Sequence, residues 1–562
     1  MSKNIQFEKN KRAHDLYINK PLFKSLLTIL TPGLVMNLMT GIYIFTSQVL
    51  ITRLAPIAHG SNIAENFTHW FNNIDFQHIK SLGYTNPVGD TIKGAMSISS
   101  PLITIIASSP FFLAGGATVV FTQAMGKKNR YKANEIFKTS FWMVICLAIL
   151  EIIILLSINK PVLTAMSPKS ETTTDPILQD FFNQEHALQI KFAREYTLIY
   201  SIGIFLPLLM FYFASLVKSE GRFRLVVITS IVCNVLNIGC IIFFILVAKI
   251  DMYGGALGST ISYTINLTTI LVYIGFLNKK NDTWLSFKVL FKKGESKIVW
   301  NLILPIILVG LSSFLIDLSY AIANMAYIPL LAKNAEIIYL PAQGNTMYFQ
   351  TLEGAIMPTL NFVFVTIYGI IDGARTIVAY NYANGNWKRI KNAYHLTMLL
   401  TFAYSMFMFL LIAVALGKPI LQLFDVNQSM LNDGYKTMLI QLCMVPIFSL
   451  QVSAMSIYMA IGDIVKSNIS AIFQDTITFF PIMFIMLAIT KSLNNIWLFV
   501  ATYVINAFIA TLIMVIFTEW WIKKRFGKIK TKKKVNGVIK TEWIQTNKPK
   551  PSYIERMLNK VI

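Results

Sequence analysis

Long apolar runs alternate with short polar segments along most of this chain. A helix needs about 20 predominantly apolar residues to cross a bilayer. The apolar runs are long enough for twelve such helices, and most charged residues fall between them. We therefore predict an all-α membrane protein with twelve spanning helices. The predicted spans are 24–52, 95–125, 139–159, 195–217, 225–248, 254–277, 299–326, 345–374, 395–416, 437–461, 468–490 and 496–520.

Lys and Arg are distributed unevenly over the segments between these spans. If the N-terminus is placed in the cytoplasm, 38 of the 50 Lys and Arg residues fall on the cytoplasmic side and 12 on the outer side. Cytoplasmic loops of membrane proteins carry an excess of these residues. We therefore expect both termini in the cytoplasm, which agrees with an even number of spans.

The composition supports a membrane protein. Hydrophobic residues make up 55% of the 562 residues and charged residues 14%, whereas soluble proteins carry roughly 25% charged residues. The formal net charge is +23, and the last segment, which follows the final span directly, holds 13 of the 50 Lys and Arg residues. A basic segment in that position favours contact with anionic lipid over binding of nucleic acid.

These patterns divide the chain into five regions. Two outer segments, 53–94 and 160–194, read as long polar loops that either cap the outer opening or are tolerated surface insertions. The predicted regions are a cytoplasmic N-terminal segment (1–23), an N-terminal six-helix lobe (24–278), a cytoplasmic interfacial linker (279–298), a C-terminal six-helix lobe (299–522) and a basic cytoplasmic tail (523–562).

The sequence contains no motif of catalysis or cofactor binding. Its four cysteines lie in apolar runs without CxxC or CxxH spacing, and its six histidines form no HExxH pair. A Walker A pattern, which direct ATP coupling would need, is also missing. We therefore expect no enzyme, no cofactor and no structural metal. A membrane-embedded transferase would need a catalytic His/Asp or Cys cluster near one interface, and none is found.

Two stretches, 257 positions apart, align without a gap. They span residues 116–129 and 373–386, and each runs from an apolar helix end through a turn of small residues into a basic segment. Such a repeat predicts two homologous halves, as in many transporters. Glycine allows close helix approach, so we interpret the repeated residues as structural. They are Gly116, Gln123 and Gly126 in the first half and Gly373, Tyr380 and Asn381 in the second.

The repeat resembles the multidrug and toxic compound extrusion (MATE) family, within the wider multidrug, oligosaccharidyl-lipid and polysaccharide flippase group. The first half matches through Thr122-Gln123-Ala124-Met125-Gly126 and the second through Tyr380-Asn381-Tyr382-Ala383-Asn384. Weaker matches at Ser219-Glu220-Gly221 and Ala460-Ile461-Gly462 fall in the same order as in the family. The resemblance implies two pseudo-symmetric lobes and an antiporter that exports lipophilic, usually cationic compounds against an inward flow of Na+ or H+.

The first helix departs from the family pattern. Many bacterial members carry an Asp in this helix, whereas the matching position here holds Ser47, followed by Gln48. The predicted first span contains no acid at all. If coupling uses an acidic group, we expect that group elsewhere, in the second half of the chain.

Five acids lie inside the predicted spans away from their ends, and an acid within a membrane is a candidate functional residue because its charge is costly there. Asp317 is the first candidate for cation coupling or a Na+ site, and Asp475, six residues before Pro481, is the second. Glu353 precedes Pro358 by five residues, also beside a possible kink. The remaining two are Asp372, which could instead pair with Arg375 at i+3, and Glu151 in the first half.

The favoured function is secondary active multidrug efflux by alternating access, by a monomer in the bacterial plasma membrane. Its partners would be small lipophilic cations and membrane lipids, and its driving force a Na+ or H+ gradient. A flippase for lipid-linked or polysaccharide precursors is the alternative within the same group. Basic cavity residues would favour the flippase, but the predicted spans hold almost none.

Overall fold

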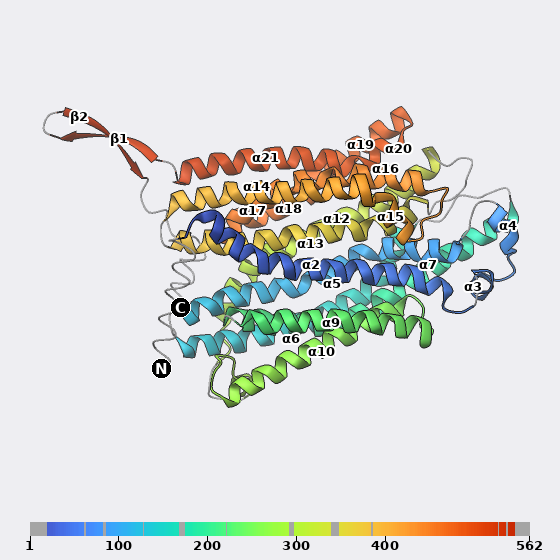
Figure 1. Cartoon of the computed structure of the whole chain (residues 1–562), viewed down its shortest axis with the longest axis horizontal. Helices are drawn as coiled ribbons and strands as arrows, with labels where there is room; N and C mark the ends of the chain where they lie inside the picture. The colour runs from blue at the N-terminus through green and yellow to red at the C-terminus, as the bar shows by residue number, and fades with distance from the viewer. Residues whose placement is uncertain are drawn as a thin grey trace.

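Two groups of long helices lie side by side in the computed structural model (Figure 1). Both described chain ends, at α2 and α21, lie at one end of the bundle, which we call the terminal end; the opposite end is the far end. The structure describes residues 20–60, 63–81, 86–126, 129–167, 175–220, 222–291, 297–338, 348–383, 386–526, 528–535 and 538–545.

The N-terminal lobe contains six spans. One of them is a bent pair, α7 and α8, which meet at 46°. Short helices η2, α3 and α4 lie between the first two spans. The elements are α2 (Leu22–Leu54), η2 (Ala55–Ile57), α3 (Ile63–Trp70), α4 (Phe76–Ser81), α5 (Pro87–Gly126), α6 (Arg130–Met166), α7 (Pro176–Gly203), α8 (Phe205–Ser219), α9 (Phe223–Ile242), η3 (Phe243–Val247) and α10 (Tyr253–Lys279).

The C-terminal lobe repeats this arrangement after the short α11 (Phe287–Phe291). Its elements are α12 (Trp300–Ile338), α13 (Tyr348–Ala383), α14 (Trp387–Leu411), η4 (Ile412–Leu416), α15 (Gly417–Leu423), α16 (Leu431–Leu442), α17 (Met444–Ile461), α18 (Ile464–Ile472), η5 (Phe473–Thr478), α19 (Phe479–Leu493), α20 (Ile496–Val500) and α21 (Thr502–Phe526). The described part of the chain thus has eleven helices able to cross a membrane, or twelve with the bent pair counted as one span. The predicted all-α fold with two six-helix lobes is confirmed, and the cytoplasmic placement of both termini stays a prediction.

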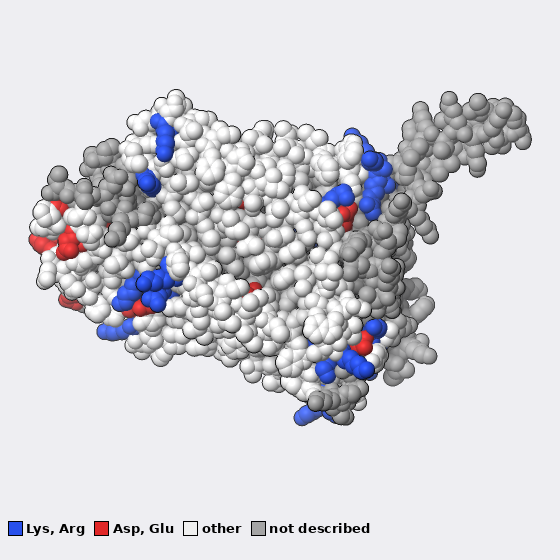
Figure 2. All heavy atoms as spheres, turned by 180° about the vertical axis from the view of Figure 1, so that it is seen from behind, with Lys and Arg blue, Asp and Glu red and all other residues white. Residues whose placement is uncertain are grey.

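The outer surface of the bundle is apolar over most of its length. Large side chains such as Ile153 and Val272 expose 58% and 68% of their surface. Figure 2 shows Lys and Arg gathered toward the two ends of the molecule, separated by a broad belt that is almost free of charge. An apolar surface of this extent is unusual for a soluble monomer but suits a lipid-facing belt.

The two segments predicted as long loops are instead largely helical. The segment 53–94 contains η2, α3, α4 and the start of α5, and the segment 160–194 contains the end of α6 and more than half of α7. Their polar composition misled the hydropathy pattern, because a helix that projects beyond the bilayer no longer needs an apolar surface. These extensions carry polar contacts at the far end that are described below.

The sequence repeat corresponds to equivalent turns in the two lobes. The backbone N–H of Asn129 donates to the carbonyl of Ala124 at 3.1 Å, and 257 positions later Asn386 donates to Asn381 at 3.0 Å. Gly116 and Gly373 each lie ten residues before the end of their helix, because α5 runs to Gly126 and α13 to Ala383. Of the other motif residues, the side chains of Gln123 and Tyr380 lie outside the described part.

Two glycines allow the lobes to approach closely. A Cβ atom at Gly116 in α5 would lie 2.0 Å from the carbonyl oxygen of Ile306 in α12, and one at Gly310 would lie 1.7 Å from that of Phe112. Real Cβ atoms never come so close to a backbone oxygen. The packing role proposed for Gly116 is therefore supported, with α12 of the other lobe as its partner.

Replacing Gly116 by valine should destabilise the protein. The new side chain would force α5 and α12 apart, and overpacking of this kind costs about 1–3 kcal/mol. The measurement is thermal unfolding in detergent, where Gly116→Val should melt several degrees below wild type. Gly115→Val is the matched control, because a Cβ there meets no atom within 4 Å. Equal melting temperatures for the two variants would contradict this account of the packing.

Beyond α21 the chain forms an antiparallel hairpin of β1 (Lys528–Val535) and β2 (Val538–Gln545). Lys528 pairs with Gln545 and Val535 with Val538. The hairpin projects from the terminal end of the bundle (Figure 1). The hydropathy pattern did not predict these strands, and contact of the basic tail with lipid stays a prediction.

Candidate functional site

Two of the predicted acids lie near each other inside the C-terminal lobe. Asp317 lies near the middle of α12, and its side chain is partly exposed. Asp475 lies in η5, with 5% of its surface exposed. The two carboxyl groups are close enough to interact electrostatically. Because neighbouring carboxylates in an apolar setting repel each other and are poorly solvated, such a pair favours a bound proton or cation.

The helix that carries Asp475 departs from α-helical geometry. Residues of η5 form a π-helical turn shortly before Pro481, and π-helical turns are frequent at functional sites. Asn506 of α21 holds this turn in place. Its Nδ2 donates to the carbonyl of Gln474 at 3.0 Å, and its Oδ1 accepts from Thr478 Oγ1 at 2.7 Å. The local distortion expected from the proline is therefore present, while the role of Asp475 stays a prediction.

Glu353 is the third acid of this lobe. It lies in α13 and is fully buried, with 0% of its surface exposed. One carboxylate oxygen, Oε1, accepts a hydrogen bond from Nε2 of Gln441 in α16. The other, Oε2, has no hydrogen-bond partner among the described residues. Leaving a buried polar group unpaired costs about 1–3 kcal/mol, and more if it is charged, so this oxygen is suited to carry a proton or to meet a cation.

Three tyrosines lie near these acids. Tyr320 and Tyr503 each interact electrostatically with both Asp475 and Glu353. The ring centroid of Tyr503 lies 4.8 Å from that of Tyr327 and 6.3 Å from that of Tyr320. The acids and the aromatic rings therefore form one group, which we call the C-lobe cluster. It consists of Asp317, Glu353, Asp475, Tyr320, Tyr327 and Tyr503.

Asp372 is not placed in this group. It lies in α13, but its side chain falls outside the described part of the chain. Its pairing with Arg375 therefore stays a prediction. Among the side chains that the structure describes, no three His, Cys, Asp or Glu residues converge as metal ligands do.

The N-terminal lobe carries neutral polar groups where the family has an acid. Ser47 in α2 is buried, and its hydroxyl lies 3.5 Å from Oδ1 of Asn237. Asn237 donates to Ser259 Oγ at 3.2 Å, and this hydroxyl lies 2.9 Å from that of Tyr43. Gln48 is partly exposed. The position of the missing acid thus belongs to a hydrogen-bonded cluster of hydroxyl and amide groups, which carries no charge.

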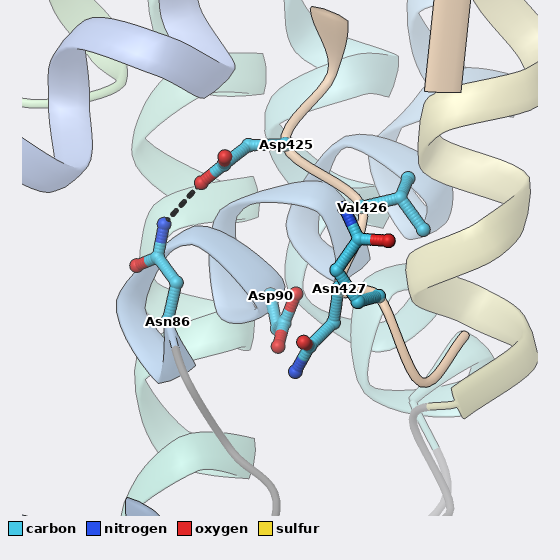
Figure 3. A pocket seen from close by; sticks show the side chains of 6 residues that line it. Asn86, Asp90, Asp425, Val426 and Asn427 are labelled. Carbon is cyan, nitrogen blue, oxygen red and sulfur yellow. Dashed lines mark hydrogen bonds between the residues drawn. The ribbon is translucent and has the colours of Figure 1, made fainter. Parts of the chain in front are cut away.

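At the far end, one residue of the C-terminal lobe gathers three side chains of the other lobe. Asp425 lies between α15 and α16 with a left-handed backbone (φ 56°). Its carboxylate lies 3.0 Å from Nη1 of Arg53 and accepts from Nδ2 of Asn86 at 2.6 Å (Figure 3). Its backbone carbonyl accepts from Nζ of Lys93 at 2.6 Å. We call Arg53, Asn86, Lys93 and Asp425 the far-end latch.

The latch borders a pocket of about 230 Å³. Asp90 and Asn427 direct their side chains toward the same space (Figure 3). Asp90 also lies 2.8 Å from Nζ of Lys93, which has 0% of its surface exposed. A buried lysine is stable only when its charge is paired. Lys93 is therefore held between an acid of its own lobe and a carbonyl of the other, so separating the lobes at this end would remove one of its two partners.

The sequence alone did not identify the latch or the hydrogen-bonded partners of the acids. Asp90 and Lys93 were assigned to a polar loop, although their i, i+3 spacing is typical of a pair on one helix face. Gln441 and Asn237 lie within predicted spans, where amide side chains are uncommon, and that signal could have marked them. Their pairing with Glu353 and Ser47 follows from helix packing, which one sequence does not reveal.

The chain is similar in sequence to known proteins. A sequence model of the MatE family matches residues 82–242 and 354–485. The chain is 25% identical to an uncharacterized protein of Mycoplasmoides gallisepticum over 90% of each chain. It is 20% identical to the multidrug export protein MepA of Staphylococcus haemolyticus, over 75% of this chain and 84% of that protein.

Solved structures show the same fold. One is an inward-facing multidrug resistance MATE family transporter, with a TM-score of 0.64 and 16% identity over 88% of this chain and 98% of that one. Another is an outward-facing structure of such a transporter, with a TM-score of 0.65 and 15% identity over 90% and 97% of the two chains. The family match covers more than half of the sequence and falls in both lobes. The chain therefore belongs to the MatE family of membrane transporters.

Proposed function

We propose that this protein is a secondary active efflux transporter that exports lipophilic cations in exchange for Na+ or H+. The observation that carries the proposal is the unequal chemistry of the two lobes. Three buried or partly buried acids lie near tyrosine rings in the C-terminal lobe, whereas the equivalent region of the N-terminal lobe holds neutral hydroxyl and amide groups. Coupling is therefore assigned to the C-lobe cluster, with Asp317 and Asp475 as its centre.

The C-lobe cluster suits two alternative occupants, a coupling ion and an organic cation. A carboxylate in this apolar setting needs a positive partner, which Na+, H+ or an organic cation can supply. The tyrosine faces add attraction for an organic cation, because the ring quadrupole favours a positive charge over it. If the occupants exclude each other, binding of the coupling ion releases the drug. Exchange then needs only that the coupling ion and the drug prefer different conformations of the transporter, one open to the inside and the other open to the outside.

The contacts between the lobes supply the parts that must move. The latch joins the lobes at the far end, which we expect to face the outside of the cell, and Gly116 and Gly310 bring α5 and α12 together toward the terminal end. Outward release requires the latch to open. The relatives from Mycoplasmoides and Staphylococcus support a bacterial plasma membrane as the location.

The test is efflux of a fluorescent lipophilic cation from proteoliposomes under an imposed Na+ or H+ gradient. We expect outward transport that stops when the active gradient is collapsed with an ionophore. Efflux at the same rate with and without either gradient would contradict the exchange mechanism. Movement of a fluorescent lipid between leaflets, without cation efflux, would instead favour the flippase alternative.

A further inference from the structure

A second pocket lies on the outside of the N-terminal lobe, between α6 and α7. Its volume is about 380 Å³. Three basic side chains line it: Lys160 of α6 and Lys191 and Arg194 of α7. All three are exposed. Neither the latch nor the C-lobe cluster includes any of these residues.

The charge of this pocket is predominantly positive. Its lining includes one acid, Glu195, which interacts electrostatically with Lys191 and Arg194. Three cations and one carboxylate leave a positive excess. Lys191 also lies over the ring of Trp70, with its Nζ 5.3 Å from the ring centroid. The basic groups are thus gathered around one cavity, and one of them is held by an aromatic partner.

The position of the pocket matches the edge of the apolar belt. On α6, the exposed side chains are apolar through Ile153 and Leu156, and the next turn brings Lys160. On α7, Arg194 is followed toward the belt by the exposed Ile202, and Phe205 of α8, also exposed, comes next. Both surfaces therefore change from apolar to basic at the same level. In membrane proteins this change marks the boundary between acyl chains and headgroups.

Apolar side chains also line the pocket. Ala187, Ile190 and Leu198 flank the basic residues along α7. A cavity lined by both basic and apolar side chains, at the edge of the apolar belt, fits an amphipathic anion. A small free anion would satisfy the cations but would leave the apolar lining uncovered.

We infer that this pocket binds one anionic phospholipid in the leaflet at the far end. The phosphate contacts Lys160, Lys191 and Arg194, and the acyl chains lie along the exposed apolar side chains of α6 and α8. Basic residues at a membrane surface attract anionic lipid by this electrostatic effect. The same helix α7 carries Gln189, whose Nε2 donates to Gln350 of the other lobe at 3.2 Å. The bound lipid is therefore attached to a helix that joins the lobes at the far end.

The experiment measures retention of phosphatidylglycerol by native mass spectrometry. The full-length protein is extracted from vesicles of equal phosphatidylglycerol and phosphatidylcholine and compared with the triple variant Lys160→Gln, Lys191→Gln, Arg194→Gln. We expect wild type to retain phosphatidylglycerol selectively and the variant to lose at least two thirds of that retention. A control triple variant removes the same charge from the other lobe and should retain lipid as wild type does. It combines Lys418→Gln, Lys436→Gln and Lys491→Gln.

Two further arms decide the outcome. Inorganic phosphate at millimolar concentration should not displace the lipid. The charge-preserving pair Lys160→Arg, Lys191→Arg should keep it, which shows that the positive charge is what retains the lipid, and an unchanged melting temperature of the triple Gln variant excludes misfolding as the cause of its loss. Unchanged retention in the triple Gln variant would overturn the inference. So would full displacement by inorganic phosphate, because it would show a site for a free anion, or an equal loss in the control triple variant.

Discussion

Asp317→Asn should reduce gradient-driven efflux to the background of empty liposomes. The substitution keeps the size of the side chain but removes the charge that would hold a cation beside Asp475. A cation that keeps only one of these two carboxylate partners in this setting loses about 2.5–3.5 kcal/mol of stabilisation, which corresponds to a rate change on the order of 100-fold. The measurement is the initial rate of cation efflux from proteoliposomes at matched protein content.

Glu151→Gln provides the control for this experiment. Glu151 is also an acid within a span, but it lies in α6 of the N-terminal lobe and accepts a hydrogen bond from Ser109 at 2.6 Å. Glutamine can still accept that bond, so efflux should stay within about twofold of wild type, as expected where a neutral acceptor preserves the contact. Wild-type transport in Asp317→Asn, or equal losses in both variants, would contradict the assignment of coupling to the C-terminal lobe.

Locking the far-end latch should stop transport completely but reversibly. In a background with the four native cysteines replaced by alanine, Asn86→Cys and Asp425→Cys place one thiol on each side of a 2.6 Å contact between the lobes. A short bifunctional methanethiosulfonate reagent would then join the lobes at that end. Because alternating access requires these residues to separate, efflux should fall to background and return when a reductant breaks the link.

Each single cysteine variant controls for the reagent itself. Modified with the same compound, Asn86→Cys or Asp425→Cys alone cannot join the lobes, so transport should remain well above that of the linked pair. If the linked protein still transports at the rate of the unlinked pair, the latch does not need to open. The exported compound would then not leave the protein at the far end.

Much of the fold could be predicted because lipid imposes a simple rule on sequence. A spanning helix must be apolar over a fixed length, so the twelve spans and the two halves were visible, and the repeat at Gly116 and Gly373 showed their equivalence. The rule fails outside the bilayer. The part of α7 outside the bilayer is amphipathic and polar. Its residues, which precede the predicted fourth span, were therefore predicted as a loop.

The candidate site could be predicted in part for a related reason. Acids within spans are few and costly, so Asp317, Glu353 and Asp475 were identifiable from sequence, and the structure brings them into one lobe with shared tyrosine neighbours. Tyrosines are common in membrane proteins and carry no such signal. The latch was missed because Arg53 and Asp425, 372 positions apart, meet only through the packing of the lobes.

Equilibrium binding of a lipophilic cation tests the central claim most directly. The purified protein is titrated with a fluorescent cation at several Na+ concentrations and pH values, without any gradient. If the C-lobe cluster binds the coupling ion and the drug in turn, raising Na+ or lowering the pH should weaken binding at least about tenfold, or by about 1.4 kcal/mol. Asp475→Asn should remove that dependence. Tight binding that responds to neither ion, or an unchanged response in Asp475→Asn, would contradict the account.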